Sequence, residues 1–152
     1  MPEVFLNNLS ALKVRFFYEE LCDTVGCVVV RVEGQHRHGS DGNSDSDFIC
    51  AMARAAMTAW SPWAVVLDFS DFDYCYGNRL LRLVKLTIDD EGQPTFPLII
   101  VANSATKESM VALFKEFLAD ESTSHLPIYF VSTITEAYST VESQWNRGMQ
   151  PN

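Results

Sequence analysis

Three aspartates, Asp68, Asp71 and Asp73, lie close together directly after an apolar run. Carboxylates at this density can hold a metal ion or act as general acids. If segment 68–74 is extended, however, Asp71 and Asp73 share one face and Asp68 points to the other. No histidine is near enough in sequence to complete a metal site. We therefore expect solvated carboxylates, some of which accept hydrogen bonds from backbone N–H groups, and no metal site.

Cys75 lies between Tyr74 and Tyr76, just before an expected helix. A helix amino terminus lowers a thiol pKa, so Cys75 could act as a nucleophile, with His36 or His38 as its base. Nothing in the spacing requires this, and we predict no catalytic residue. A contact surface that includes the two tyrosines is the preferred interpretation. The two histidines could also bind a metal or respond to pH, but a solvated loop is the simpler reading.

The segment 35–47, "QHRHGSDGNSDSD", is expected to be a polar loop. Asp41, Asn43 and Asp45 match the first alternating ligand positions of an EF-hand. Met52 stands where the bidentate glutamate of such a loop would be, so we expect no calcium site.

The composition is that of an acidic globular chain. With 152 residues, 47% of them hydrophobic, we expect one domain over 1–152 with its core at about 13–146. A formal charge of −9 argues against nucleic acid and anionic membranes, and favours a protein partner with a basic surface. The chain shows no signal peptide, no membrane-spanning run and no metal-like cysteine spacing. We expect a reducing, cytoplasmic setting and no cofactor.

The hydrophobic pattern predicts alternating strands and helices. Expected strands are 13–21, 27–34, 64–69, 97–103 and 126–132, and expected helices are 48–60, 78–86, 105–120 and 134–145. Expected helix caps are Ser46 or Asp47, then Ser104 or Thr106, then a capping box of Thr133 with Glu136. The order predicts an α/β fold, in which an N-terminal hairpin precedes alternating βα units and helices pack on a mostly parallel central sheet.

Four strings resemble the STAS domain family: "VVVRVEG", "AVVLDFSDFDY", "PLIIVANSATKESMVALF" and "IYFVSTITEAYSTV". The resemblance covers roughly 14–141. It implies the fold of bacterial anti-sigma factor antagonists and of sulfate-transporter cytoplasmic tails. The implied function is a non-enzymatic, protein-binding module in bacterial signalling or stress regulation.

One departure from the family pattern affects regulation. Antagonists of the family carry an Asp-Ser pair at the strand-to-helix junction, and a kinase phosphorylates that serine. Here Tyr76 falls at the aspartate and Gly77 at the serine, and Ser70 lies too early to replace it. The resemblance therefore implies a module that the usual serine phosphorylation does not switch.

The expected partner-binding surface lies where the third strand gives way to a helix. It consists of Asp71, Asp73, Tyr74, Cys75, Tyr76, Gly77, Asn78 and Arg79, with the loop residues His36, His38 and Asp41 beside it if the second and third strands are neighbours. Two alternatives remain. One is a small-molecule or nucleotide site at the amino terminus of the helix that begins at Gly77–Asn78. The other is a Cys-His or crotonase-like enzyme. The hairpin edge also permits pairing of two copies.

Overall fold

The computed structural model describes residues 5–22, 25–74, 77–89, 91–119 and 126–148. Its elements are η1 (Leu6–Asn8), β1 (Lys13–Leu21), β2 (Val25–Gln35), η2 (Gly39–Asp41), α1 (Gly42–Trp60), β3 (Ala64–Phe69), β4 (Phe72–Asp73), η3 (Arg79–Leu86), β5 (Leu98–Ala102), α2 (Ser104–Leu118), β6 (Ile128–Val131) and α3 (Ile134–Gly148). No helix in these ranges is long and apolar enough to cross a membrane.

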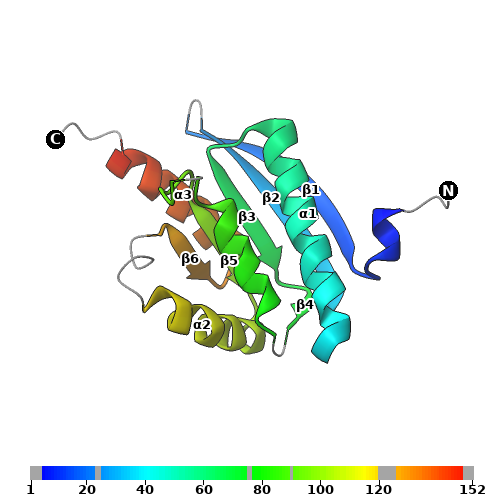
Figure 1. Cartoon of the computed structure of the whole chain (residues 1–152). Helices are drawn as coiled ribbons and strands as arrows, with labels where there is room; N and C mark the ends of the chain where they lie inside the picture. Colours follow the sequence, from blue (N-terminus) through cyan, green and yellow to red (C-terminus); the bar gives the residue numbers. More distant parts are fainter. Residues whose placement is uncertain (1–4, 23–24, 75–76, 90, 120–125, 149–152) are drawn as a thin grey trace.

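One sheet organises the molecule (Figure 1). Its strands follow the order β1-β2-β3-β5-β6, and the short β4 pairs with the end of β2. The β1–β2 hairpin is antiparallel, whereas β2, β3, β5 and β6 run parallel. The predicted fold class, an N-terminal hairpin followed by alternating βα units, is confirmed.

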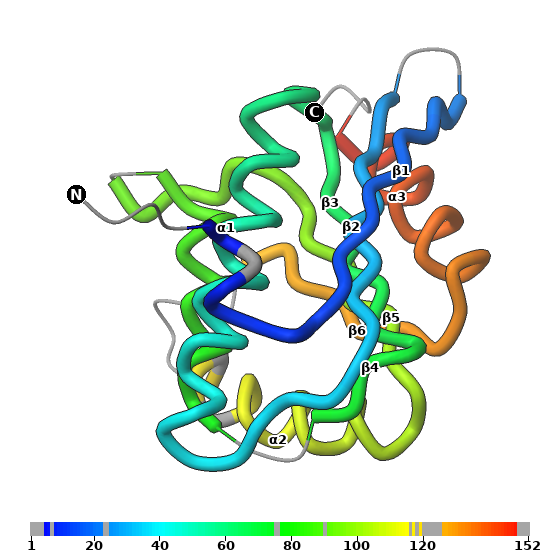
Figure 2. The backbone as a smooth tube through the Cα atoms, turned by 90° about the vertical axis from the view of Figure 1, so that its right-hand side faces the viewer, coloured from blue at the N-terminus to red at the C-terminus, as the bar shows by residue number. Residues whose placement is uncertain are grey.

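Helices cover both faces of the sheet, with α1 and α2 on one side and α3 on the other (Figure 2). Alternate side chains of β2 pack into the core on either face of the sheet, because successive side chains of a strand point to opposite faces. Val28 and Val30 join the core beneath α1, η3 and α2, whereas Cys27 and Val29 pack toward α3. Strands buried on both faces read as continuous apolar runs, which explains "CVVVRV".

Helix α1 begins earlier than predicted, at Gly42, so Ser46 and Asp47 lie within it and do not cap it. Its buried stripe follows helical spacing from the first turn: Gly42, Asp45, Ser46, Phe48, Ile49, Ala53 and Ala56. With a helix start at Phe48, the i, i+3, i+4 spacing of apolar residues predicts that Ala55 and Ala59 face inward, but both are exposed. The error arose because the polar first turns, which set the register, were taken for a loop.

The other two predicted caps gave opposite results. Neither Ser104 nor Thr106 caps α2; Asn103 does, accepting a hydrogen bond from the backbone N–H of Thr106. The capping box of α3 is confirmed, because the Glu136 N–H donates to Thr133 Oγ1 at 3.2 Å. Glu136 reaches back to accept from the Ser132 N–H at 2.8 Å.

The expected helix 78–86 is a 3-10 helix, η3. A 3-10 helix has three residues per turn, so residues three apart lie in one row. Leu80, Leu83 and Leu86 form such a row and are buried against the core, as is Val84. This row fixes which side of η3 faces solvent.

Candidate functional site

Asp68, the penultimate residue of β3, has hydrogen-bond donors on both of its carboxylate oxygens. One of its oxygens accepts from Arg31 Nε at 2.7 Å, and the other accepts from the N–H and hydroxyl of Ser70 at 3.1 and 2.6 Å. Burial raises the pKa of Asp68, but the hydrogen bonds from Ser70 and Arg31 outweigh it and hold the pKa below its usual value. Asp68 therefore anchors the turn that starts the junction between β3 and η3.

Asp71 and Asp73, in contrast, are exposed, as the alternation of an extended segment predicts. Their backbones are fixed although their carboxylates are not. The carbonyl of Asp71 accepts from the Gly34 N–H at 3.0 Å, and that of Asp73 accepts from the His36 N–H at 2.9 Å. Within the described residues no three His, Cys, Asp or Glu side chains could hold a metal ion together. The junction therefore offers two free carboxylates on a rigid backbone.

His36 is buried, with 5% of its surface exposed, so the expectation of a solvated loop is wrong for this residue. Its Nε2 lies 2.9 Å from Ser46 Oγ, and its ring packs edge-on against Phe72 and Tyr74. Burial lowers the pKa of His36, and the nearby Asp45 carboxylate opposes that effect. Because Ser46 is equally buried, the pair is closed to substrate and holds the loop to α1.

Tyr74 is also buried, at 4% exposure, so it does not present a contact surface as expected. Its hydroxyl donates to the Gly77 carbonyl, and burial raises the pKa of Tyr74 to about 12. Gly77 has a φ of 136°, a conformation that favours glycine. Tyr74 thus supports this turn from inside. The predicted positions Cys75 and Tyr76 lie outside the described residues.

The loop after β2 is held by one ion pair. Asp45, 1% exposed, accepts from the Arg37 guanidinium at 2.7 Å, from the Arg37 N–H at 2.9 Å and from Ser10 Oγ at 2.6 Å. Burial raises the pKa of Asp45, but these hydrogen bonds outweigh it and keep the pKa below its usual value. The carboxylate that resembled an EF-hand ligand therefore ties the loop to the amino-terminal segment.

These contacts bring the loop and the junction together around a hollow of about 630 Å³. The hollow is lined by Gly39, Ser40, Asn43, Gly77, Asn78 and Leu113. The loop lies beside the junction because β2 pairs with β3, which is the condition under which we expected the two to be neighbours. Sequence reasoning found Gly77 and Asn78 and placed the loop 34–45, which contains Gly39, Ser40 and Asn43, beside them, but it missed Leu113.

The remaining predicted residues are next to lining residues of this hollow in the sequence. His38 and Asp41 are exposed residues of the loop. Arg79 binds Asp47 of α1 through two hydrogen bonds of 3.0 and 2.9 Å. That ion pair joins the start of η3 to α1.

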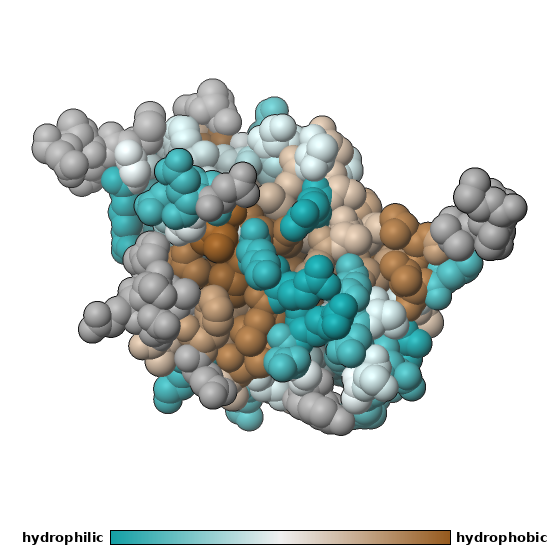
Figure 3. Space-filling model, in the orientation of Figure 1, coloured by the Kyte–Doolittle hydropathy of each residue, from teal (hydrophilic) through white to brown (hydrophobic). Residues whose placement is uncertain are grey.

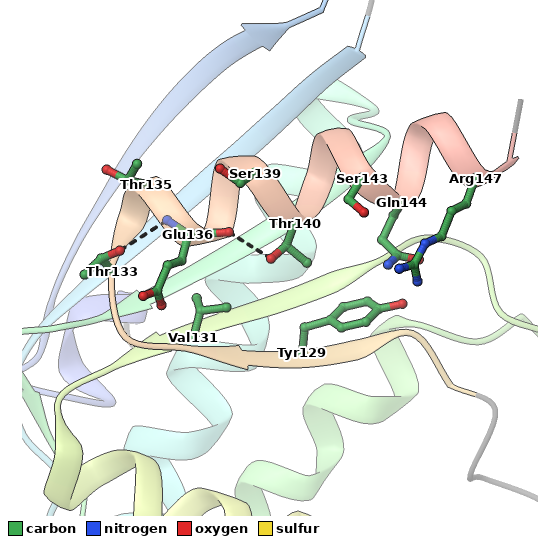
Figure 4. Close-up of a pocket in the computed structure, with 10 residues that line it drawn as sticks. All are labelled: Tyr129, Val131, Thr133, Thr135, Glu136, Ser139, Thr140, Ser143, Gln144 and Arg147. Atoms are coloured by element: carbon green, nitrogen blue, oxygen red, sulfur yellow. Dashed lines mark hydrogen bonds between the residues drawn. The ribbon is translucent and has the colours of Figure 1, made fainter.

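A second hollow, of about 590 Å³, lies between β6 and α3 (Figure 4). Hydroxyl groups of Ser139, Thr140 and Ser143 line it, with Tyr129 on the strand side. Glu136, at one end, is already used in the helix cap. The sequence analysis did not identify this groove.

Comparison with known proteins supplies one result. No protein-family model and no curated protein matches the chain. Among solved structures, the crystal structure of an anti-sigma factor antagonist from Mycobacterium paratuberculosis is similar, with a TM-score of 0.55 and 21% sequence identity. The match covers 86% of this chain and 95% of that one. The chain therefore has the fold of that antagonist, which confirms the STAS-like fold expected from the sequence.

Proposed function

We propose that this chain is a non-enzymatic regulatory module that binds another protein through the junction surface. We define the junction surface as Asp71 and Asp73 together with the hollow lined by Gly39, Ser40, Asn43, Gly77, Asn78 and Leu113. The observation that carries the proposal is this hollow, formed by segments far apart in sequence. It lies beyond the carboxyl ends of β2 and β3, where open α/β sheets bind their ligands. The likeness in fold to an anti-sigma factor antagonist supports the same reading.

Electrostatics favours a partner that places basic groups over Asp71 and Asp73. Both carboxylates are exposed, and the chain carries a formal charge of −9. Long-range attraction of this kind acts mainly on the association rate. The association rate constant should therefore fall as salt is added.

Two groups that could support catalysis have structural roles, and a third, Cys75, lies outside the described residues. His36 is buried against Ser46, and the N–H of Gly34, a strand-end glycine of the kind that a crotonase-like enzyme would use in an oxyanion hole, donates to the Asp71 carbonyl. Gly77 stands at the family's serine position, so this site cannot be phosphorylated there. The module would therefore act in bacterial cytoplasmic signalling without the usual serine switch.

The proposal is tested by comparing two hollows of similar size. Arginine is introduced at Ser40 and Asn78 in the junction hollow, or at Ser139 and Ser143 in the groove of Figure 4, so that the change in charge is equal. Ser40 and Asn78 belong to the proposed surface, whereas Ser139 and Ser143 do not. Capture from native lysate, read by mass spectrometry, should lose a specific protein only with Ser40→Arg/Asn78→Arg. Loss only with Ser139→Arg/Ser143→Arg, or capture of the same proteins by both variants, would refute the proposal.

A further inference from the structure

Four of the eleven lysines and arginines gather on one side of the molecule. Arg79, Arg82 and Lys85 lie on η3, and Arg54 lies on α1. Arg54 and Arg82 together line a hollow of about 370 Å³ with Asp47, Cys50 and Ala51. Figure 3 shows hydrophilic residues gathered over α1 and η3, with hydrophobic surface beside them. We call this groove between the two helices the basic seam.

The 3-10 geometry of η3 creates the basic seam. Residues three apart in a 3-10 helix are eclipsed, so Arg79, Arg82 and Lys85 form one row along η3. The neighbouring row, from Leu80 to Leu86, is buried in the core. In a regular α-helix each step of three residues would fall short of a full turn by about a sixth of a turn, because it has 3.6 residues per turn, and the three cations would not form one row.

The seam carries excess positive charge. Asp47 is the acidic residue in its lining, and its carboxylate is shared between Arg79 and Arg82. No ion pair joins Arg54 to another residue within the described ranges. One carboxylate thus faces three guanidinium groups, in a chain whose formal charge is −9.

The charges of three arginines act on Cys50, which lines the hollow. Burial raises the pKa of the Cys50 thiol to about 11; the charges of Arg82, Arg54 and Arg79 act to lower it, and the charge of Asp47 acts to raise it. All three guanidinium groups are therefore close enough to Cys50 to act on a negative charge placed there. Because Arg54 and Arg82 both line the hollow beside Cys50, the hollow can accept an anionic side chain between them.

The seam continues from the junction surface. Asn43, in the junction hollow, precedes Asp47, Cys50 and Arg54 at helical spacing along α1. On the other side, Asn78 of the same hollow is followed directly by Arg79. A partner that covers the junction hollow and extends along α1 and η3 therefore also meets the basic seam.

We propose that the protein partner lays an acidic segment, carrying aspartate or glutamate side chains, along the basic seam with a carboxylate in the hollow between Arg54 and Arg82. This inference rests on the proposed function for the identity of the partner as a protein. The opposite charges of Asp71 and Asp73 and of the basic seam would help to fix the partner's orientation.

The test is a titration that needs no knowledge of the partner. The ¹⁵N-labelled full chain is titrated with hexaglutamate, and with hexalysine and inorganic phosphate for comparison. Hexaglutamate should shift the amide signals of Cys50, Ala51, Arg54 and Arg82, and added salt should reverse the shifts. Because the chain as a whole repels a polyanion, binding must arise from a local excess of positive charge.

Variants decide whether the seam is responsible. Arg54→Glu/Arg82→Glu should weaken hexaglutamate binding by about tenfold or more. Lys13→Glu/Lys115→Glu, at two exposed positions elsewhere, changes the net charge equally and should weaken it far less. Arg54→Gln/Arg82→Gln gives a milder test if the charge reversal disturbs folding, and it should also weaken binding.

Three results would overturn the inference: no shifts at the seam, equal weakening by both charge-reversal pairs, or equally strong shifts with phosphate, which would indicate a site for free anions. Failure of the proposed function looks different. In that case hexaglutamate binds the seam, but Ser40→Arg/Asn78→Arg captures the same proteins as the wild-type chain.

Discussion

Replacing Gly42 with alanine sets helix propensity against packing at the start of α1. Gly42 has ordinary helical angles, with φ −70° and ψ −14°, so propensity alone predicts that alanine stabilises by about 0.5–1 kcal/mol. The structure predicts the opposite. A Cβ at this position would lie 2.2 Å from the Arg37 carbonyl oxygen and 2.4 Å from His36 Cε1.

Both distances are far inside van der Waals contact, and neither neighbour can move freely. The Arg37 oxygen is backbone, and the His36 ring is buried between Phe72 and Tyr74. Overpacking of this kind costs about 1–3 kcal/mol, and the backbone contact places Gly42→Ala toward the upper end. After the gain in propensity, we expect a net loss of roughly 2 kcal/mol.

Urea unfolding followed by circular dichroism measures this loss. For a chain of this size the midpoint should fall by roughly 1 M. Gly148→Ala is the matched control, because it also lies in a helix but a Cβ there would meet nothing within 4 Å. If Gly42→Ala is as stable as wild type or more so, the packing described for His36 and Arg37 against α1 is wrong.

Two further predictions concern the buried titratable side chains of His36 and Asp68. Since the pKa of His36 is lowered by burial, the unfolded chain binds more protons, and the free energy of unfolding should fall as the pH drops below about 6.5, levelling below the folded-state pKa. Urea midpoints between pH 7 and 5 should fall less steeply in His36→Gln, and an unchanged slope would contradict the prediction. Asp68→Asn should cost about 2 kcal/mol, less than a fully buried pair because the Arg31 side chain is 32% exposed. Asp71→Asn, at an exposed position, should change stability by less than about 0.5 kcal/mol, and equal losses for both variants would refute the roles given to Asp68 and Asp71.

The layers of the fold were readable from the sequence because strands buried on both faces leave continuous apolar runs. The start of α1 was not readable. Its first turns contain glycine, asparagine, serine and aspartate, which locally favour turns. What makes them helical is tertiary: Asp45 bonds Arg37 and Ser10, and Ser46 bonds His36. None of these partners is implied by local sequence.

The candidate site was predictable in position but not in detail. The rule that ligands bind at the carboxyl ends of parallel strands identified the junction with Gly77 and Asn78. Burial was not predictable, because His36 and Tyr74 are enclosed by each other and by segments distant in sequence. The basic seam was not predicted for a similar reason, because Arg54 lies beside the arginines of η3 only as a result of the packing of α1.

The central claim, that the junction surface binds a protein, is tested most directly by site-specific photo-crosslinking in native cells. The photoreactive amino acid p-benzoylphenylalanine is placed at Asn78 in the junction hollow, or at Ser143 in the groove between β6 and α3, both exposed. If the junction surface binds a protein, a discrete crosslinked protein should form from position 78 and none from position 143. A crosslink from position 143 alone, or from neither position while the chain is folded and abundant, would contradict it.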